Sequence, residues 1–382
     1  MKLLTILIYD TNYVPGVPRV IPLLKIRAWQ KNNCHITILC TKEGEAFYKR
    51  EVQNVSFISI NYVYKIKNAY SLPWEVTKVT ISTLMRIKEI IGKFDVVYSQ
   101  SAIIDFLFVP WVLKIIDKHI RWYVMVDNLV PPPSQRPGPF LKKFIPYVAF
   151  LAGNLLLQKA DGLFVVTNFL KKYYGSRGYH VIKTADGYGI DVAIFTGKIP
   201  KDTPAFDAVY CGRLHAAKGV FDLIEVMKEV AKTRKYFILG ILGDGEQSVK
   251  EQLQEKIFTY KLKKHISFTG YITGKSKGNI LRNSGLFIFL SYDEGCPHAV
   301  IEAFANNKLV IAYDLPIYYQ VFAKYIKSGQ MILFKQGEFQ KIALFINKET
   351  YKNNIFKNSL NDYTWDKITM NELIHMKVLN NS

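Results

Sequence analysis

The sequence predicts two α/β domains, each built on a doubly wound parallel sheet covered by helices. Short apolar runs alternate with stretches of helical periodicity along the chain, which is the pattern of parallel strands joined by helical crossovers. The 382 residues exceed what one hydrophobic core usually organises, and at roughly 150 residues per domain they indicate two or three domains. A polar segment with two prolines at 197–204 has the composition of a linker, which places the domain boundary near residue 200.

Eleven runs have the length and composition of buried strands. In the first half they are Leu3–Tyr9, His35–Cys40, Val55–Ile60, Val96–Ser99, Arg121–Val126 and Gly162–Val166. In the second half they are Ala208–Cys211, Tyr236–Leu242, Ile266–Phe268, Leu286–Leu290 and Leu309–Tyr313. Helical periodicity between the runs predicts helices at Arg19–Gln30, Val220–Lys232 and Ser248–Lys256.

The chain is strongly basic, with 51 Lys and Arg residues, 31 Asp and Glu residues and a formal net charge of +20. Such a charge attracts polyanions, anionic lipid head groups or phosphorylated small molecules. The sequence contains no zinc-finger spacing, no aromatic ribonucleoprotein signature and no basic helix continued by heptads. We therefore expect no specific nucleic-acid partner.

The cysteines and the apolar segments indicate the cellular compartment in which the protein is expected. Cys34, Cys40, Cys211 and Cys296 are far apart in sequence, which argues against a zinc cluster or a dense disulfide framework and favours a reducing, cytoplasmic compartment. The apolar opening stops at Asp10 without a small-residue cleavage site, so it is predicted to be a strand rather than a signal peptide. No apolar run reaches the ~20 residues that span a bilayer.

The apolar stretch Phe144–Leu157 comes nearest to that length and follows Lys142 and Lys143. One interpretation is a buried helix of the first domain, which fits the stretch residue by residue. The other is a helix that contacts an anionic membrane surface, at the inner face of the cell membrane, through its apolar face and its basic flank. The net charge favours the second interpretation, and both remain open at this point.

The strongest site signal follows the strand expected at Leu286–Leu290. Gly295 and Pro297 form a turn that leads into a new helix, at the sheet edge where ligands of open α/β folds bind. The first backbone N–H groups of a helix have no partner within it, so they form a seat for phosphate. The residues that provide this predicted seat are His298, Ala299 and Val300.

Two carboxylates flank this turn, Glu294 before the helix and Glu302 within it. A rise of about 1.5 Å per helical residue separates them by roughly 10 Å, so they can hold two ends of one ligand. Carboxylates accept hydrogen bonds from hydroxyls, which suits a sugar at one end and a ribose at the other. A purely structural alternative for Glu294 is a favourable interaction with the helix dipole, and for His298 an ordinary place in the first turn.

Two more glycine-containing loops follow expected strands of the second half. Gly212, Arg213 and Lys218 follow its first strand, where a planar guanidinium and a mobile ammonium suit a diphosphate. Gly243 and Gly245 follow the next strand and permit close approach of a ligand to the backbone, although ordinary turn glycines explain them as well. The histidines lack the spacing of metal ligands, so no metal is predicted.

Together these motifs resemble those of the GT-B glycosyltransferases, in particular the large retaining family 4, over most of the chain. In that family a Gly-Arg-Leu-x-x-x-Lys-Gly motif clamps the donor diphosphate, which implies this role for Arg213 and Lys218. The family's E-x7-E motif is similar to Glu294 and Glu302. The resemblance implies that the first carboxylate contacts the transferred sugar and the second contacts the nucleotide ribose.

Weaker matches to the family occur in the expected order. Gly16 and the helix after it resemble the glycine loop that meets the donor phosphates. The stretch 189–191 resembles the family's Asn-Gly-Val-Asp sequence, with Tyr188 in place of Asn, and Trp365 resembles the aromatic residue that opens the last helix.

The acceptor side of the family pattern is less complete. Many members carry a His after a late strand of the first domain, where this chain has Asp127 and Asn128. We take these two residues as the acceptor-side candidates, and a strand-end cap is the structural alternative for Asp127.

The resemblance implies two Rossmann-like domains that face a central cleft. Residues 1–200 would bind the acceptor, 201–355 would bind the nucleotide sugar, and 356–382 would form a helix that packs back on the first domain. The implied enzyme is a hexosyltransferase that moves a sugar from a UDP- or GDP-sugar to a glycan, lipid-linked or small-molecule acceptor, as in cell-envelope polysaccharide. Retention of anomeric configuration is implied, and no cofactor is expected beyond the donor substrate.

Two other functions are compatible with these motifs. One is a protein that binds nucleotide sugars but has lost transfer activity, since the acceptor-side His is missing and the glycine loop departs from the family pattern. The other is a GT-B-fold epimerase, which would interconvert nucleotide sugars without an acceptor.

Overall fold

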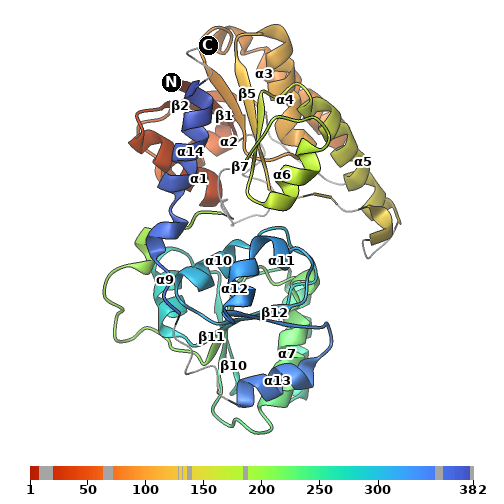
Figure 1. Ribbon diagram of the computed structural model, residues 1–382, viewed down its shortest axis with the longest axis vertical. Coiled ribbons are helices and arrows are strands. Elements are labelled where there is room, and N and C mark those ends of the chain that lie inside the picture. The colour runs from red at the N-terminus through yellow and green to blue at the C-terminus, as the bar shows by residue number, and fades with distance from the viewer. Residues whose placement is uncertain are drawn as a thin grey trace. The chain divides into compact units, whose positions relative to one another are not determined.

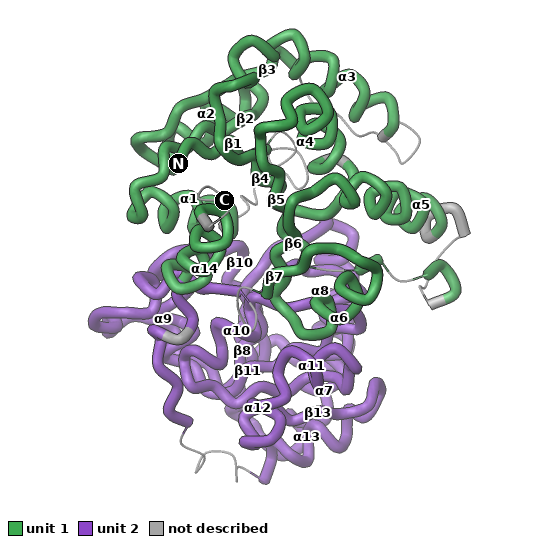
Figure 2. The backbone as a smooth tube through the Cα atoms, turned by 45° about the horizontal axis from the view of Figure 1, so that its top comes forward, with its two compact units in different colours: residues 1–186, 365–382 green, residues 187–364 purple. Residues whose placement is uncertain are grey.

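The computed structural model describes residues 1–7, 20–62, 72–127, 129–130, 132–135, 140–183, 188–348 and 356–378. The chain divides into two compact units, residues 1–186 with 365–382, and residues 187–364 (Figure 2). Each unit contains one parallel sheet with helices packed against it (Figure 1). The predicted α/β class with two doubly wound sheets is confirmed.

The first unit has a seven-stranded sheet in the order β3-β2-β1-β4-β5-β6-β7. Every pair of neighbours in this sheet is parallel. The strands are β1 (Lys2–Ile6), β2 (His35–Thr41), β3 (Ser56–Ile60), β4 (Val96–Ser99), β5 (Arg121–Val126), β6 (Gly162–Val165) and β7 (Val181–Lys183). The central strands are buried on both faces, which explains why they are continuous apolar runs rather than alternating ones.

Seven α-helices and two short 3₁₀ helices of the described residues belong to this unit. They are α1 (Val20–Lys31), α2 (Lys42–Glu51), α3 (Leu72–Leu84), η2 (Ile87–Glu89), α4 (Ile104–Ile116), η3 (Pro133–Gln135), α5 (Phe140–Leu157), α6 (Asn168–Gly175) and α14 (Trp365–Val378). Because the strand order reverses after β3, right-handed crossovers place α1 and α2 on one face of the sheet and α3 to α6 on the other.

The last helix, α14, returns to the first unit and packs along α1, as predicted (Figure 1). A buried ion pair joins the two helices, with Lys25 Nζ 2.7 Å from Glu372 Oε1 and both side chains fully inaccessible to solvent. The Tyr98 hydroxyl of β4 lies 3.1 Å from the same carboxylate oxygen. The C-terminal helix is therefore tied to the sheet of the first unit by a charged group that water does not reach.

The second unit has a six-stranded parallel sheet in the order β10-β9-β8-β11-β12-β13. Its strands are β8 (Ala208–Cys211), β9 (Leu239–Leu242), β10 (Ile266–Gly270), β11 (Leu286–Phe289), β12 (Val310–Tyr313) and β13 (Met331–Phe334). Its described helices are η4 (Val192–Phe195), η5 (Ala216–Lys218), α7 (Val220–Val230), α8 (Gln247–Thr259), α9 (Gly274–Asn283), α10 (His298–Ala305), α11 (Tyr318–Val321), α12 (Ala323–Lys327), α13 (Phe339–Asn347) and η7 (Leu360–Tyr363).

The polar segment 197–204 falls within the second unit by this division. Two side chains at the end of α9 donate to its carbonyls: Arg282 Nη2 lies 2.8 Å from Gly197 O, and Asn283 Nδ2 lies 2.9 Å from Thr203 O. The segment is thus fixed to the second unit although its composition is that of an exposed linker.

Candidate functional site

The predicted donor-site loops meet where the second sheet reverses its strand order. β8 and β11 are neighbours there, and the chain leaves them in opposite directions along the sheet, which is the position where open α/β folds bind ligands. Two hydrogen bonds join the loops that follow these strands. Tyr292 N donates to Ala217 O at 3.0 Å, and Ser291 Oγ donates to the same carbonyl at 3.2 Å.

These bonds bring together two residues that lie 76 positions apart in the sequence. Lys218 Nζ lies 2.5 Å from Glu294 Oε1 and donates a hydrogen bond to it. The carboxylate side chain is 8% exposed and the lysine side chain is 26% exposed, so the ammonium is the part of the pair that water reaches more easily. The loop after β8 thus places a cation directly on the first carboxylate of the E-x7-E motif.

Arg213 lies in the same loop and is exposed. Its carbonyl accepts a hydrogen bond of 2.8 Å from the hydroxyl of Tyr210. Burial raises the pKa of Tyr210, the charge of Glu294 raises it further and the charge of Arg213 lowers it, so both charged groups act on one hydroxyl. Among the described residues the Arg213 guanidinium has no ion-pair partner, which leaves it available to an anion.

The helix that follows Glu294 begins without a side-chain cap. α10 starts at His298, and Pro297 occupies the cap position, where its side chain offers no hydrogen-bond acceptor. The backbone N–H of Val300 bonds to Pro297 O at 3.1 Å, whereas no described group accepts a hydrogen bond from the N–H of His298 or Ala299. Two of the three N–H groups predicted to seat a phosphate are therefore unpaired in the part of the chain that the structure describes.

The second carboxylate of the motif, Glu302, is 2% exposed and already paired. Lys277 Nζ of α9 lies 2.6 Å from its Oε1 and 2.6 Å from its Oε2. Burial has the largest single effect and lowers the pKa of Lys277, but the charge and hydrogen bond of Glu302, together with the charges of Cys211 and Tyr271, raise that pKa above its ordinary value. Lys277 therefore stays charged and compensates a carboxylate that would otherwise be isolated from water.

His298 contacts both Glu302 and the first residues of the second unit. Its Nδ1 lies 3.5 Å from Glu302 Oε1, and its Nε2 lies 2.8 Å from Gly189 O. Burial lowers the pKa of His298, while the carboxylate of Glu302 acts in the opposite direction. The structure thus brings Tyr188, Gly189, the first turn of α10 and Glu302 into one cluster.

Close backbone packing explains three glycines of these loops. A Cβ at Gly219, which has φ +68°, would lie 1.8 Å from Leu290 O. A Cβ at Gly243 would lie 1.8 Å from Gly212 O, and one at Gly245 would lie 2.1 Å from Leu214 O. No side chain fits at those distances, so glycine is required there whether or not a ligand binds.

Other predicted site residues lie elsewhere. Asp127 follows β5 in the first unit. Its negative charge acts to raise the pKa of two buried groups, the Lys25 ammonium and the Tyr98 hydroxyl. Gly16 and Asn128 lie outside the described residues. Within the described ranges no group of three or more His, Cys, Asp or Glu side chains is arranged to hold a metal ion.

Sequence reasoning missed two residues of this cluster. Lys277 sits in a helix without a recognisable motif, and only the geometry shows that it meets Glu302. Tyr318 is fully buried, and its hydroxyl has no hydrogen-bond partner among the described residues. Burial raises the pKa of Tyr318, and the charges of Glu294, Cys296 and Asp293 add to this effect.

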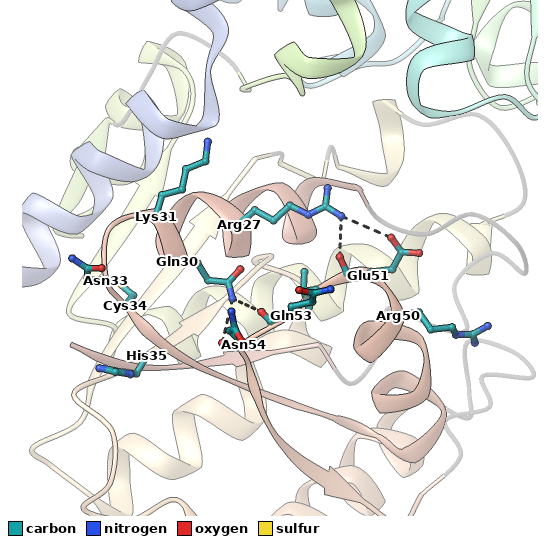
Figure 3. A pocket seen from close by; sticks show the side chains of 11 residues that line it. Arg27, Gln30, Lys31, Asn33, Cys34, His35, Arg50, Glu51, Gln53 and Asn54 are labelled. Atoms are coloured by element: carbon teal, nitrogen blue, oxygen red, sulfur yellow. Dashed lines mark hydrogen bonds and ion pairs between the residues drawn. The ribbon is translucent and has the colours of Figure 1, made fainter.

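A separate hollow of about 840 Å³ lies in the first unit, at the ends of α1 and α2 (Figure 3). Its polar side chains largely bind neighbouring groups: Arg27 Nη2 donates to Glu51 O at 2.9 Å, and Gln30 Nε2 donates to Gln53 O at 2.5 Å. None of the predicted site residues lines it. His35 at its edge begins β2, so the hollow lies near the amino ends of the strands, away from the edge that the motifs occupy.

Comparison with known families agrees with the geometry. The model of the family "Glycosyl transferases group 1" matches residues 192–360, which lie within the second unit and include every donor-site loop described above. Over these residues the chain is similar to the group 1 glycosyltransferases. It is therefore identified as an enzyme of the glycosyltransferase class.

This glycosyltransferase has curated relatives that are also named as glycosyltransferases. It is 28% identical over 286 residues to an uncharacterized glycosyltransferase of Methanocaldococcus jannaschii, a match that covers 71% of this chain and 67% of the relative. It is 33% identical over 141 residues to TuaC of Bacillus subtilis, which is named as a teichuronic acid biosynthesis glycosyltransferase. That second match covers 37% of this chain and 32% of TuaC.

Solved structures share the two-unit GT-B fold of this glycosyltransferase. The sucrose-phosphate synthase of Thermosynechococcus elongatus superposes with a TM-score of 0.77 at 14% identity, with all of both chains covered. HepE of Anabaena, solved in complex with UDP and glucose, superposes with a TM-score of 0.67 at 14% identity, again with all of both chains covered. At these identities the likeness establishes the fold.

Proposed function

We propose that the chain transfers a sugar from a UDP- or GDP-sugar to a glycan, lipid-linked or small-molecule acceptor, with retention of anomeric configuration. The observation that carries the proposal is the contact of Lys218 with Glu294 at the strand-order reversal, beside the unpaired first N–H groups of α10. A diphosphate needs positive charge and backbone donors in one place, and a sugar needs a carboxylate next to them. The complex of HepE with UDP and glucose, formed on the same fold, supports this donor class.

The roles of the residues follow from where charge moves. In the reaction the anomeric C–O bond to the diphosphate breaks, a C–O bond to the acceptor hydroxyl forms, and the hydroxyl proton leaves with the diphosphate. Negative charge thus develops on the leaving group. Arg213, Lys218 and the N–H groups of His298 and Ala299 would stabilise this charge, because fixed positive groups aimed at a developing anion lower the barrier.

Glu294 and Glu302 would position the donor rather than act as acids. Each carboxylate has a lysine partner, Lys218 and Lys277 respectively, which balances its charge, and carboxylate oxygens accept hydrogen bonds from hydroxyls. We assign Glu294 to the transferred sugar and Glu302 to the ribose. No carboxylate is then left as a dedicated nucleophile among these residues, which fits attack from the face that the diphosphate leaves.

A transfer assay with radiolabelled UDP- and GDP-sugars tests this function. The proposal expects label in an acceptor fraction, slow donor hydrolysis without acceptor, and loss of both in Glu294→Ala. Tight donor binding with neither transfer nor hydrolysis would identify a binding protein instead. Conversion of the donor sugar to its epimer without an acceptor would identify an epimerase, a class that also occurs among the structural neighbours.

A further inference from the structure

The helical layer on one face of the first sheet, made of α3 to α6, exposes large apolar side chains. On α3 these are Trp74, Ile81 and Met85, which are 63%, 55% and 81% exposed. On the opposite face of the sheet, α1 and α2 expose no large apolar side chain among the described residues, and α14 exposes Met370 and Ile374. The apolar surface of the unit is therefore concentrated on one layer.

Four exposed apolar side chains form a stripe along α5, one more than the three on α3. Phe144, Val148, Leu151 and Leu155 are 42%, 44%, 46% and 67% exposed. They are spaced by four, three and four residues, which keeps them within an arc of about 60° on a helix with about 3.6 residues per turn. Every exposed residue between 144 and 155 belongs to this stripe.

The opposite side of α5 packs on the core. Gly153 lies half a turn away from the stripe and is buried, and a Cβ there would lie 3.3 Å from Leu107 Cδ1 of α4. The stripe is therefore the outer face of a helix whose inner face is already occupied. Of the helices in the described ranges, none has the length and apolarity to cross a bilayer, so the stripe is a surface feature.

Basic residues accompany the stripe. Residues 140–183 contain seven Lys and Arg residues and a single acidic residue, Asp161. Asp161 is already paired, because its Oδ2 lies 2.9 Å from Lys114 Nζ. Three of the basic residues, Lys171, Lys172 and Arg177, lie exposed on α6 and the turn after it.

Hydrogen bonds place these cations next to the stripe. The Tyr179 hydroxyl donates to Asn154 O of α5 at 2.8 Å, and the Tyr174 hydroxyl of α6 donates to Asn154 Oδ1 at 3.3 Å. Asn154 adjoins Leu155 of the stripe, and α5 and α6 lie next to each other in both views of the unit (Figures 1 and 2). The layer thus combines an apolar ridge with adjacent exposed cations.

We propose that α5 and α6 dock the glycosyltransferase on an anionic bilayer surface, with the apolar stripe lying in the head-group region. An amphipathic helix binds a membrane in this way when its apolar face is flanked by lysine and arginine. The stripe extends about 16 Å along the helix axis, at about 1.5 Å for each of eleven residues. For all four side chains to enter the head-group region, the axis of α5 must lie parallel to the membrane surface. An uncharged partner would leave the surrounding cations without a counter-charge, and this favours an anionic membrane.

Sedimentation of the full chain with vesicles tests the docking surface without any donor sugar. We expect binding to phosphatidylcholine vesicles that contain about one third phosphatidylglycerol, and binding at least about tenfold weaker to phosphatidylcholine alone. Replacing the stripe by serine (Phe144→Ser, Val148→Ser, Leu151→Ser, Leu155→Ser) should also weaken binding at least about tenfold. The matched control replaces exposed apolar residues of the second unit, Tyr236→Ser and Phe258→Ser, which are 91% and 84% exposed, and should bind as the natural chain does.

A charge variant keeps the test decisive if the serine variant fails to fold. Lys171→Gln with Lys172→Gln leaves the stripe intact and should weaken binding to anionic vesicles and its dependence on salt. Binding that is equal for both lipid compositions, or that both variants retain, would overturn the proposal. So would a dimer in light scattering that the stripe variant converts to a monomer while the natural chain binds no vesicles, because the stripe would then be an interface between two copies.

Discussion

Lys218 Nζ and Glu294 Oε1 lie 2.5 Å apart on loops that follow neighbouring strands of the second sheet. The pair holds a mobile cation at the edge where a diphosphate would arrive, and it neutralises a carboxylate that is mostly buried. A bound donor would let the ammonium contact phosphate while the carboxylate turns to sugar hydroxyls. The contact therefore places the group that would bind the diphosphate of the donor next to the group that would bind its sugar.

Removing the Lys218 ammonium should slow transfer. We expect Lys218→Met to lower kcat by about 10²- to 10³-fold, as the loss of one group that stabilises a developing anion typically does. The control is Lys232→Met, which removes a 61% exposed lysine that pairs with Glu229 in the same unit. Steady-state kinetics should show the loss in the first variant and unchanged rates in the second.

Lys277→Met should destabilise the second unit, because it leaves the buried carboxylate of Glu302 without its cation. Breaking such a buried pair costs about 3–5 kcal/mol, and we expect this loss in urea unfolding of the full chain. Combining it with Glu302→Gln removes both charges and should recover a large part of the stability. If the double variant is no more stable than Lys277→Met, the charges of Lys277 and Glu302 do not stabilise each other in the folded protein.

The stability of the second unit should depend on the protonation of His298. Its folded pKa lies below the ordinary value, so the unfolded chain binds the proton more readily as the pH falls. The contribution of the neutral ring is therefore present above about pH 6.5, the ordinary pKa of histidine, and is lost as the pH falls through the lower folded pKa. Urea unfolding at neutral and mildly acidic pH measures this.

Two variants isolate that effect. The stability difference between the natural chain and His298→Gln should shift in favour of the variant as the pH falls. His119→Gln, at an exposed position of the first unit, should show the same difference at both pH values. Equal behaviour of the two variants would contradict the assignment to His298.

The C-terminal helix should depend on its buried pair. Glu372→Ala leaves the buried amine of Lys25 without its carboxylate in the core of the first unit, which should cost about 3–5 kcal/mol. Asp366→Ala breaks a pair with Lys31 in which both side chains are at least half exposed, and should cost at most about 1 kcal/mol. Unfolding free energies that are lowered equally by both changes would refute the special role of the buried pair.

The sequence predicts the sheets well, because parallel strands buried on both faces are continuous apolar runs. β4, β5 and β8 begin and end at the predicted residues. The edge strands β7 and β13 were not predicted. β7 has three residues, which carry little apolar pattern. β13 has four apolar residues, as many residues as β4 and β8, but only its first is fully buried.

Motif spacing predicts which loops share an edge of the sheet, but not which side chains touch. Lys218 and Glu294 follow neighbouring strands, so their proximity could be inferred from topology. The contact of Lys277 with Glu302 could not, because it depends on how a helix without a motif packs against α10. The sequence also leaves open why Gly243 and Gly245 are glycines, because both ligand binding and close packing would require them. The structure shows that close backbone packing requires glycine at both positions.

Calorimetric titration of UDP and GDP into the natural chain, Lys218→Met and Lys232→Met tests the donor site most directly. We expect at least one nucleotide to bind the natural chain and Lys218→Met to raise its Kd at least about tenfold, about 1.4 kcal/mol, whereas Lys232→Met leaves it unchanged. Binding of neither nucleotide, or an equal Kd in all three proteins, would contradict the assignment of Lys218 and Glu294 to the donor.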